Sequence, residues 1–365
     1  MKKIISVVGA RPNFIKIAPI HKSFQKYKGQ IRHLICHTGQ HFDEKMSKIF
    51  FDDLKMPKPN FYLGISGGSH AVQTARIMIE FEKILLEEKP DLVIVPGDVN
   101  STIAASLVAA KLHIPVAHVE AGLRSFDRKM PEEVNRVLTD EISDYLFVTE
   151  KSGLTNLKNE GVNNSKIYFT GNVMIDSLVN FMSHINKSKI IDNLALKQGN
   201  YILATFHRPS NVDEEENLSQ LIEVINKISK VRTVVFPIHP RTRNNINKFG
   251  LSKKLGNSVI ILDPIGYIDF LSLTKNAELV VTDSGGIQEE TTFLGVQCIT
   301  VRDNTERPIT TEIGTNHLIG TDFNKAFLVS KLILDGNKKP GRIPELWDGK
   351  ASERIVEIVY QSLFI

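Results

Sequence analysis

The stretch that decides the fold is H-V-E-A-G-L-R-S-F-D-R-K-M-P-E-E-V-N-R, residues 118–136. Its start continues an apolar run and predicts a buried strand that ends on a carboxylate, Glu120. A polar loop leads to Pro131, which suits the first turn of a helix because its missing N–H would be unpaired there. Glu132 and Glu133 follow, where the helix dipole favours negative charge. Ligands of open α/β sheets bind where strands end, so this stretch predicts such a fold with a site beside Glu120.

The plain interpretation of this stretch is a capped helix whose acids face solvent. We adopt that interpretation for Glu133, which we expect to serve only the helix start. We do not adopt it for Glu120, because the end of a buried strand is a costly place for an idle charge. We expect the loop between the two elements, residues 123–130, to read the identity of the ligand.

Length and composition restrict the class of protein. The chain has 365 residues, enough for two domains, and a formal net charge of +4 without any long block of like charges. A nucleic-acid tail is therefore not indicated, whereas an anionic small ligand is compatible with the charge. Only Cys36 and Cys298 are present, so neither a disulfide framework nor a metal-ligand spacing is found. No apolar run is long enough for a membrane helix, and we expect a cytoplasmic protein.

The strand–loop–helix unit recurs through the first half of the chain. Strands are predicted at residues 3–8, 31–37 and 91–95, the last a nearly continuous apolar run typical of a parallel strand that is buried on both faces, and shorter strands are predicted at 145–148 and 167–169. The turn after the first run lacks G-x-G-x-x-G, which excludes a dinucleotide fingerprint. The carboxyl ends of parallel strands meet at one edge of a sheet, where we expect a set of polar side chains. This set is Arg11, Lys16, Gln40, Asp98 and Glu120.

A long helix is predicted over residues 71–88, and the preceding loop S-G-G-S, residues 66–69, either closes over a ligand or simply connects two elements. Apolar side chains recur along one side of this helix at Val72, Ala75, Ile79 and Leu86.

The second half begins a new series of units. Residues 186–200 are polar with little periodicity, and we place a linker between about residue 171 and this stretch. Four strands are then predicted at 201–206, 231–238, 259–262 and 278–282, and polar residues that follow them include His207, Arg208, His239 and Asp283. Strands that alternate with helices over two blocks predict two Rossmann-like, doubly wound parallel-sheet domains that face a central cleft. We assign residues 1–172 and 173–350 to these domains, and residues 351–365 to a helix that packs back on the first.

The motif T-D-S-G-G-I-Q-E-E-T, residues 282–291, predicts an anion site. Ser284, Gly285 and Gly286 lead from a strand into a helix, where small residues let backbone N–H groups approach a phosphate. Glu290 is placed to accept hydrogen bonds from a ribose diol. The plainer interpretations are a tight turn and a surface acid. Farther on, Arg302 and Arg307 either reach a diphosphate or pair with Glu306.

Nine motifs together resemble the non-hydrolysing UDP-N-acetylglucosamine 2-epimerases, which share the B-type glycosyltransferase fold. Each motif alone is weak, but all nine occur in the order of that family between residue 9 and about residue 320. They are G-A-R-P-N-F-I-K (9–16), H-T-G-Q-H (37–41), P-G-D-V-N-S-T (96–102), H-V-E-A-G-L-R (118–124), P-E-E-V-N-R (131–136), H-R-P-S-N (207–211), P-I-H-P-R (237–241), D-S-G-G-I-Q-E-E (283–290) and T-E-R-P (305–308).

The resemblance implies inversion at C2 of UDP-GlcNAc to give UDP-ManNAc without a cofactor or metal, by elimination of UDP to 2-acetamidoglucal and re-addition to the other face. It also implies a homodimer and a UDP-binding second domain. The acid–base residues of the family correspond to Asp98, Glu120, Glu132 and His207. The substrate contacts correspond to Arg11, Lys16, Ser284, Gly285, Gly286 and Glu290, with Arg307 nearby. The chemistry agrees, because moving a proton at C2 requires positioned bases and a leaving diphosphate requires cations.

The chain departs from the family pattern in two motifs. Many members have a basic residue where this chain has Pro209, and many read Q-H-R where this chain has Q-H-F-D, with Phe42 and Asp43. Some bacterial members bind a second UDP-GlcNAc as activator around positions that correspond to Gln40, Arg208 and His239, and the departures affect this region.

The motifs leave more than one activity open. Two of them, G-A-R-P and H-T-G-Q-H-F-D, also resemble the motifs of a sister group that acts on UDP-2,3-diacetamido uronic acids. A glycosyltransferase of the same fold, a hydrolytic epimerase and a sugar-nucleotide sensor are further hypotheses.

Overall fold

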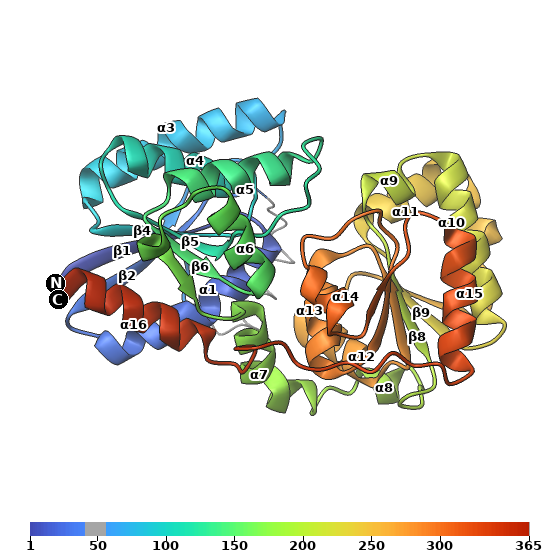
Figure 1. Cartoon of the computed structure of the whole chain (residues 1–365). Coiled ribbons are helices and arrows are strands. Elements are labelled where there is room, and N and C mark those ends of the chain that lie inside the picture. Colours follow the sequence, from blue (N-terminus) through green and yellow to red (C-terminus); the bar gives the residue numbers. More distant parts are fainter. Residues whose placement is uncertain (41–55, 365) are drawn as a thin grey trace. The chain divides into compact units, whose positions relative to one another are not determined.

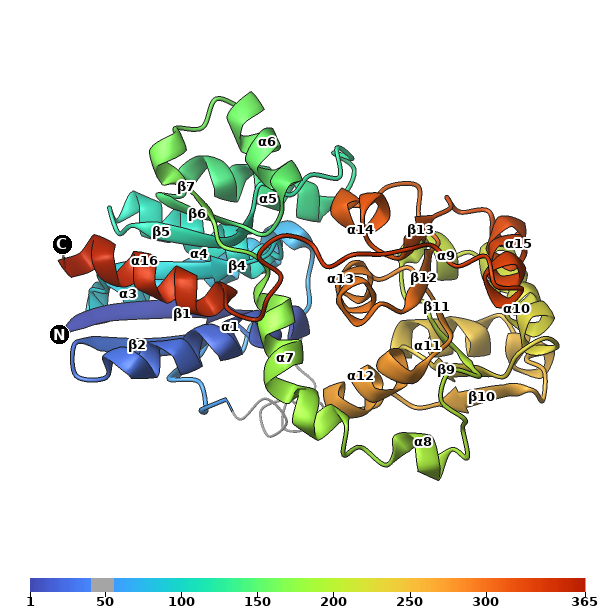
Figure 2. The same ribbon diagram turned by 60° about the horizontal axis from the view of Figure 1, so that its bottom comes forward.

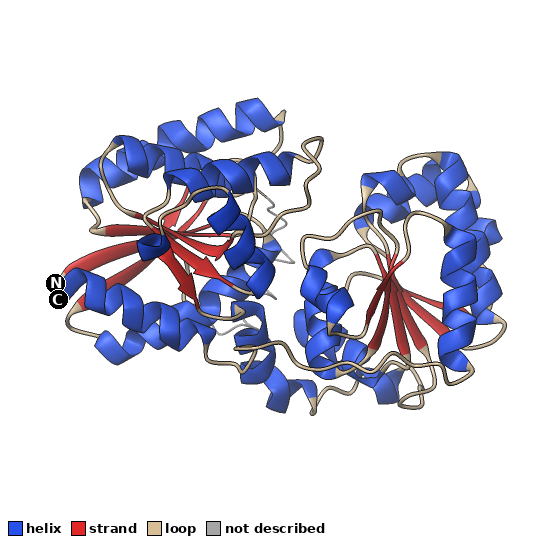
Figure 3. Ribbon diagram, viewed as in Figure 1, coloured by secondary structure: helices blue, strands red, loops and turns tan. Residues whose placement is uncertain are grey.

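The computed structural model describes residues 1–40 and 56–364, which form two compact units (Figure 1). The N-terminal unit comprises Met1–Asn180 and Glu345–Ile365, and the C-terminal unit comprises Phe181–Pro344. In each unit, helices cover both faces of a parallel sheet (Figure 3). This arrangement confirms the prediction of two doubly wound parallel-sheet domains.

The sheet of the N-terminal unit has the strand order β3-β2-β1-β4-β5-β6-β7, and all its pairs are parallel. Its strands are β1 (Lys2–Val8), β2 (Ile31–His37), β3 (Phe61–Tyr62), β4 (Leu92–Pro96), β5 (Val116–Ala121), β6 (Tyr145–Val148) and β7 (Ile167–Phe169). The described helices of this unit are α1 (Arg11–Phe24), α3 (His70–Glu88), α4 (Asn100–Lys111), α5 (Pro131–Ile142), α6 (Lys151–Asn159) and α16 (Ala351–Phe364), with short 3₁₀ turns at Gln25–Tyr27 and Asn164–Lys166. The strand order reverses between β1 and β4, so the turns that begin at Gly9 and Gly97 flank the switch point at which such sheets bind ligands.

The sheet of the C-terminal unit has the order β10-β9-β8-β11-β12-β13 and is also parallel. Its strands are β8 (Ile202–Thr205), β9 (Val234–Pro237), β10 (Val259–Leu262), β11 (Leu279–Thr282), β12 (Gln297–Thr300) and β13 (Asn316–Leu318). Its helices are α8 (Ile190–Asn193), α9 (Pro209–Val212), α10 (Glu215–Ser229), α11 (Pro240–Lys248), α12 (Tyr267–Asn276), α13 (Gly285–Leu294), α14 (Pro308–Glu312) and α15 (Phe323–Leu334), with a 3₁₀ turn at Leu251–Lys254. The order reverses between β8 and β11, so His207 and Asp283 lie on either side of this second switch point.

One helix lies in the segment for which the sequence predicts a linker. This helix, α7 (Val173–Ile185), runs across the boundary between the two units. It is amphipathic, and Ile175 and Leu178 on its apolar side are fully buried. Their spacing of three residues is a helical signal, which the polar stretch after residue 186 obscured.

The last helix, α16, belongs to the N-terminal unit and lies beside α1 (Figure 2). Asp176 accepts hydrogen bonds from the backbone N–H groups of Ala351 and Ser352, which have no partner within the helix that they begin. Just before the helix, the buried indole of Trp347 donates to the carbonyl oxygen of Thr149. The end of the chain is therefore fixed to the first sheet. Among the described helices, none combines the length and the apolar character needed to cross a bilayer.

Candidate active site

Glu120 lies at the end of β5 in an unusual backbone conformation. Its φ of +77° is rare for a residue with a side chain, and the register of β5 against β6 shifts between Val119 and Ala121. Such a bulge redirects a side chain, and strained residues of this kind concentrate at functional sites. The carboxylate is 2% exposed and forms an ion pair with Lys16 of α1, which is itself buried. The site therefore contains a buried charge pair that joins α1 to the end of β5.

The turn after β4 brings Asp98 to the same edge of the sheet. Its first residue, Gly97, has a φ of +69°, and a Cβ atom there would lie 3.1 Å from the Lys16 amine. Asn13 connects this turn to α1, because its side chain accepts from the backbone N–H of Gly9 and donates to the carbonyl oxygen of Pro96. The first turn of α1, which begins with the half-buried Arg11, is thereby fixed beside Asp98.

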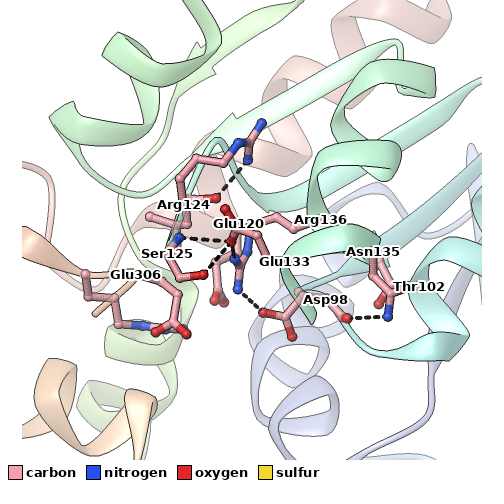
Figure 4. Close-up of polar contacts among 12 residues, drawn as sticks. Asp98, Thr102, Glu120, Arg124, Ser125, Glu133, Asn135, Arg136 and Glu306 are labelled. Atoms are coloured by element: carbon pink, nitrogen blue, oxygen red, sulfur yellow. Dashed lines mark hydrogen bonds and ion pairs between the residues drawn. The ribbon is translucent and has the colours of Figure 1, made fainter. Parts of the chain in front are cut away.

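A buried guanidinium joins two carboxylates (Figure 4). Arg136 of α5 forms ion pairs with Asp98 and with Glu133, the latter at 2.5 Å. Asp98 remains partly exposed, with 23% of its side chain accessible. Its backbone oxygen also accepts from the side-chain amide of Asn135, at 2.9 Å. Asp98 is thus held at both its side chain and its backbone, while its carboxylate can still meet a ligand.

The structure corrects the expectation that Glu133 faces solvent. Glu133 is in the first turn of α5, as predicted, but it is only 2% exposed. Its carboxylate accepts from the backbone N–H and the hydroxyl of Ser125, both at 2.9 Å, and from the N–H of Phe126 at 3.0 Å. The physical reason is that these loop donors need an acceptor and the start of α5 has no side-chain cap. Its neighbour Glu132 is the partly exposed acid of this turn.

Glu133 therefore shapes the loop of residues 123–130. Within it, Arg124 is buried and pairs with Asp140 and Glu160, so it stabilises the protein instead of facing a ligand. Phe126, by contrast, is 77% exposed with a φ of +59°. The loop presents one strained, exposed aromatic ring on a firmly anchored backbone.

Gln40 is the last described residue before the gap at 41–55. Its side-chain oxygen accepts from the backbone N–H and the hydroxyl of Ser101, at 3.0 and 2.7 Å. The hydroxyl of Ser101 is also 2.8 Å from that of Thr38. Gln40 is therefore tied to the start of α4. The motif residues His41, Phe42 and Asp43 lie outside the described part of the chain.

The switch point of the C-terminal unit holds a histidine–carboxylate pair. Asp283 follows β11 and is fully buried, and His207 follows β8 with its Nδ1 atom 3.0 Å from Asp283 Oδ1. Asp283 also accepts from the backbone N–H of Arg208 at 2.9 Å and from the side chain of Asn211 at 3.1 Å. Burial raises the pKa of Asp283, but the hydrogen bond and charge of His207 and the bonds from Arg208 and Asn211 outweigh it and lower the pKa. The ionised carboxylate fixes the imidazole ring.

The start of α13 is suited to the close approach of an anion to its backbone N–H groups. Ser284 precedes the helix without capping it, and Gly285 opens it. A Cβ atom on Gly285 would lie 3.0 Å from Arg307 Nη1, so the missing side chain makes room for that guanidinium. The helix dipole and Arg307 together favour an anion at Gly285 and Gly286.

Charged residues around α13 are largely buried and paired. Arg302 donates two hydrogen bonds to Glu306, at 3.0 and 2.8 Å, and Arg307 forms an ion pair with Glu289 at 2.8 Å. Burial raises the pKa of Glu306, but Arg302, Arg307 and Arg208 outweigh this effect and hold the pKa far below its ordinary value. The pairing with Glu306 that the sequence suggests for Arg302 and Arg307 is thus present for both, at 3.6 Å for Arg307.

Glu290 lies deeper than a surface acid of a helix would. It is 4% exposed and accepts a hydrogen bond of 3.3 Å from the hydroxyl of Tyr267. His239 caps the start of α11, because its Nδ1 accepts from the N–H of Arg241, and its ring centroid lies 5.3 Å from that of His207. Arg208 donates to the backbone oxygen of Asp283. Arg208 and His239 therefore both border the histidine–carboxylate pair.

Four residues hold the site together in roles that the sequence does not reveal. Their pairings depend on how the chain folds, so only their positions as strand-end acids or within motifs could have indicated them. They are Asp283, Arg136, Glu289 and, as a structural acid, Glu133. Each switch point thus carries chemistry of its own: carboxylates and buried cations in the N-terminal unit, and a fixed imidazole with an anion-binding helix start in the C-terminal unit. In residues 1–40 and 56–364, His, Cys, Asp and Glu form no cluster that could hold a metal ion.

Comparison with known proteins gives a consistent result. The family model for UDP-N-acetylglucosamine 2-epimerase matches residues 23–360. UDP-N-acetylglucosamine 2-epimerase of Methanocaldococcus jannaschii is 45% identical over 364 residues, which are 98% of both chains. UDP-2,3-diacetamido-2,3-dideoxy-D-glucuronate 2-epimerase of Pseudomonas aeruginosa is 46% identical over 321 residues, 87% of this chain and 88% of that one. The crystal structure of the M. jannaschii UDP-GlcNAc 2-epimerase in complex with UDP-GlcNAc and UDP is similar with a TM-score of 0.91 at 45% identity, covering 99% of this chain and 100% of that one.

Proposed function

Because the chain belongs to the UDP-N-acetylglucosamine 2-epimerase family, we propose that it interconverts UDP-GlcNAc and UDP-ManNAc through elimination and re-addition of UDP. The observation that carries this proposal is that candidate functional groups lie at the switch points of both sheets, in a chain that matches the family over residues 23–360. Acid–base groups follow strands of one sheet, and an anion-binding helix start follows a strand of the other.

The C-terminal unit supplies the features expected of a UDP site. The N–H groups at Ser284, Gly285 and Gly286 suit a diphosphate, because a helix start combines hydrogen-bond donors with a favourable dipole. Arg307 stands against Gly285 and adds a cation. Glu290 is a buried acceptor in the same helix, at a place suited to the ribose hydroxyls.

The N-terminal unit supplies the groups for proton transfer at C2. Inversion requires a proton to leave one face of the sugar and another to arrive on the opposite face, so more than one positioned acid or base is needed. We assign this work to Asp98, Glu120 and Glu132. Lys16 balances the charge of Glu120, and Arg11 at the start of α1 is a further cation for the nucleotide.

His207 completes the proposed set. Asp283 engages its Nδ1 atom, so proton exchange with the substrate would use Nε2. Breakage of the bond between C1 and the diphosphate oxygen places negative charge on UDP, and donation from His207 would stabilise that charge. The elimination leaves 2-acetamidoglucal, and return of UDP with a proton at C2 gives either epimer, so no net oxidation and no cofactor are required.

A second candidate substrate is a UDP-2,3-diacetamido uronic acid. The observation that favours it is the 46% identity with the P. aeruginosa enzyme of that name, beside 45% with the M. jannaschii UDP-GlcNAc 2-epimerase. Both substrates share the chemistry at C2 and differ at C3 and C6. The loop at residues 123–130, with its exposed Phe126, is our candidate for the part that distinguishes them.

The substrate is decided by offering both sugars to the purified enzyme. We expect proton NMR to show UDP-ManNAc forming from UDP-GlcNAc, with slower conversion of the diacetamido uronate. Faster conversion of the uronate would identify the UDP-2,3-diacetamido uronic acid, and not UDP-GlcNAc, as the substrate. Release of free sugar and UDP would indicate hydrolysis and would overturn the proposal. Because UDP-activated sugars are donors for glycosyltransferases, we further propose that the product serves polysaccharide biosynthesis in the cytoplasm.

We also propose that the protein is a homodimer formed through α3. The apolar side chains seen in the sequence of this helix face solvent: Val72, Ile79 and Leu86 are 41%, 57% and 57% exposed. They recur every seven residues, the spacing of a seam between packed helices. Two-fold antiparallel pairing centred on Ile79 would place Val72 against Leu86 of the second copy.

The charges on α3 fit the same two-fold arrangement. Arg76 and Glu82 are both exposed, three residues before and three residues after Ile79. Around a two-fold axis at Ile79, each Arg76 therefore faces the Glu82 of the other copy. A self-complementary patch of this kind is the signature of an isologous interface.

A further inference from the structure

His118 lies at the centre of β5 and is completely buried. Its Nδ1 atom is 2.6 Å from Asp140 Oδ1 of α5, and its Nε2 atom is 2.7 Å from the carbonyl oxygen of Gly97. Both distances are those of good hydrogen bonds. The two ring nitrogens thus each have one partner, Asp140 on α5 and Gly97 in the turn after β4.

Both partners of His118 accept hydrogen bonds. A backbone carbonyl oxygen has no proton to give. The other oxygen of Asp140 already accepts from the N–H of Gly122 at 3.0 Å and from Arg124 at 2.6 Å. Burial raises the pKa of Asp140, but the charges and hydrogen bonds of His118 and Arg124 outweigh it and lower the pKa. The carboxylate is therefore ionised, and each ring nitrogen must donate.

We infer that His118 is a doubly protonated imidazolium that acts as a positioning residue for the Gly97–Asp98 turn. A neutral imidazole carries a single N–H and would leave one of the two acceptors facing a lone pair. The described charged groups that face the ring are Asp140 directly and Arg124 through it. The role at Asp98 rests on the proposed function, whereas the charge of His118 follows from the hydrogen bonds alone.

The imidazolium connects the segments that follow both strand ends of the proposed site. On one side it holds the carbonyl of Gly97, the residue before Asp98, while the N–H of Gly97 donates to Val119 at 3.0 Å. On the other side it holds Asp140, which binds the N–H of Gly122, two residues after Glu120. One side chain thus sets the position of the turn that carries Asp98 against β5, the strand that carries Glu120.

We attribute the charge of His118 to precise placement of the Gly97–Asp98 turn and not to a gain in the stability of the protein. Replacing a buried ion pair by apolar residues of similar volume is often neutral or stabilising, so the pair is weak evidence of a stabilising role. By contrast, a misplacement of about 1 Å at a reacting group can cost about 100-fold in rate. We therefore attribute the buried charge of His118 to the need to hold the Gly97 carbonyl in place next to the carboxylate of Asp98, in spite of the energetic cost of burying a cation.

The charge of His118 can be read directly by NMR of the ¹⁵N-labelled enzyme at about pH 8, above the ordinary histidine pKa of about 6.5. We expect both ring nitrogens of His118 to give shifts of protonated nitrogen, with the signals assigned by their loss in His118→Gln. A signal of one unprotonated nitrogen from this ring would overturn the inference.

Two substitutions separate the two hydrogen bonds. The amide of His118→Gln replaces the Nε2 donor to Gly97, and the amide of His118→Asn replaces the Nδ1 donor to Asp140. Both variants lose one partner of a buried network, so a merely structural role would lower stability and kcat alike in both. We expect His118→Gln to keep kcat within about threefold, and His118→Asn to lose at least about tenfold in kcat with KM little changed.

Crystal structures of the two variants test positioning without reference to activity. We expect the Gly97 carbonyl to move in His118→Asn and to stay in place in His118→Gln. An unmoved turn in His118→Asn, or equal losses of kcat in both variants, would overturn the positioning role. If the wild-type protein shows no epimerisation at all, the proposed function fails, and the NMR spectrum and the crystal structures still decide the inference about His118.

Discussion

His207 Nδ1 lies 3.0 Å from Asp283 Oδ1, across the point where the strand order of the second sheet reverses. Asp283 is fully buried and ionised, whereas 38% of the His207 side chain is exposed. A buried carboxylate that binds one nitrogen of an exposed imidazole fixes its tautomer and leaves the other nitrogen for the substrate, as in other acid–base sites. The geometry thus makes Asp283 a positioning residue for His207.

Asp283→Asn should lower kcat about 100-fold, because the imidazole loses the partner that orients it. In combination with His207→Asn, it should cause no further loss, since the two residues act as a unit. Steady-state kinetics of the single and double variants measure this. Asp263→Asn is the matched control, because Asp263 also follows a strand of this sheet but is 86% exposed. Additive losses from Asp283 and His207 would contradict the positioning role.

Lys16→Met should destabilise the protein by about 3–5 kcal/mol, because it leaves the buried carboxylate of Glu120 without its cation. Adding Glu120→Gln removes the buried charge as well and should restore at least half of that loss. Urea unfolding of both variants checks the prediction. The pairing would be refuted if the double variant were as unstable as the sum of the two single ones.

Gly285→Ala should weaken UDP binding about tenfold, a change of about 1.4 kcal/mol, since its Cβ atom would meet Arg307 at 3.0 Å. Thermal stability should not fall, because alanine favours a helix more than glycine does. Calorimetric titration with UDP measures the affinity. Gly256→Ala, whose Cβ would lie 3.1 Å from Asn226 outside the site, is the control. Unchanged UDP affinity in Gly285→Ala would contradict the placement of the diphosphate at this helix start.

The free energy of unfolding should fall as the pH drops from about 6.5 to about 4. Burial lowers the pKa of His37 to about 4, and burial also lowers the pKa values of His21 and His33. Between those limits these three histidines bind more protons in the unfolded chain than in the folded one, so the stability that they contribute is complete above pH 6.5 and decreases below it. One such histidine changes stability by about 1.4 kcal/mol per pH unit.

His37→Phe should reduce this slope, since phenylalanine keeps the ring contacts with Phe14 and Tyr62 but cannot titrate. Urea unfolding at several pH values, compared with the wild type, provides the measurement. A slope that His37→Phe leaves intact would mean that His37 does not remain neutral in the folded protein.

Ile79→Glu should convert the dimer to a monomer, because it places a charge at the centre of the apolar seam of α3. Leu332→Glu, at a 53% exposed leucine of α15, should leave the dimer intact. Arg76→Glu and Glu82→Arg should each weaken the dimer, and their combination should restore it. Sedimentation equilibrium measures the mass. A wild-type monomer, or a dimer indifferent to Ile79→Glu, would exclude this interface.

The fold was predictable because its signals are local. The strands β2, β6, β7 and β10 have the bounds that the sequence predicts, and the last three are continuous apolar runs; the helix α5 begins at the predicted proline, Pro131. The three-residue strand β13 and the two-residue strand β3 offer too little periodicity to be read. The order of the strands within each sheet could not be predicted in this way, because it depends on pairing between strands that are far apart in the chain.

The sequence predicts candidate residues for the site but not their pairings. Strand-end positions indicate Asp98, Glu120 and His207 as candidates because parallel strands bring their carboxyl ends together. The sequence does not show that Lys16 reaches Glu120, since that ion pair joins residues 104 positions apart through the packing of α1 on the sheet. It also does not show that Glu133 turns inward, because burial depends on the donors of a loop folded over it.

We propose above all that this chain moves a proton at C2 of a UDP-2-acetamido sugar. The direct test is incubation of the wild-type enzyme with UDP-GlcNAc in deuterated water, followed by NMR of both epimers. We predict deuterium at C2 of UDP-GlcNAc and UDP-ManNAc alike, and none at C2 with Asp98→Asn. Formation of UDP-ManNAc without deuterium at C2, or folded enzyme that labels neither UDP-GlcNAc nor the diacetamido uronate, would contradict the account.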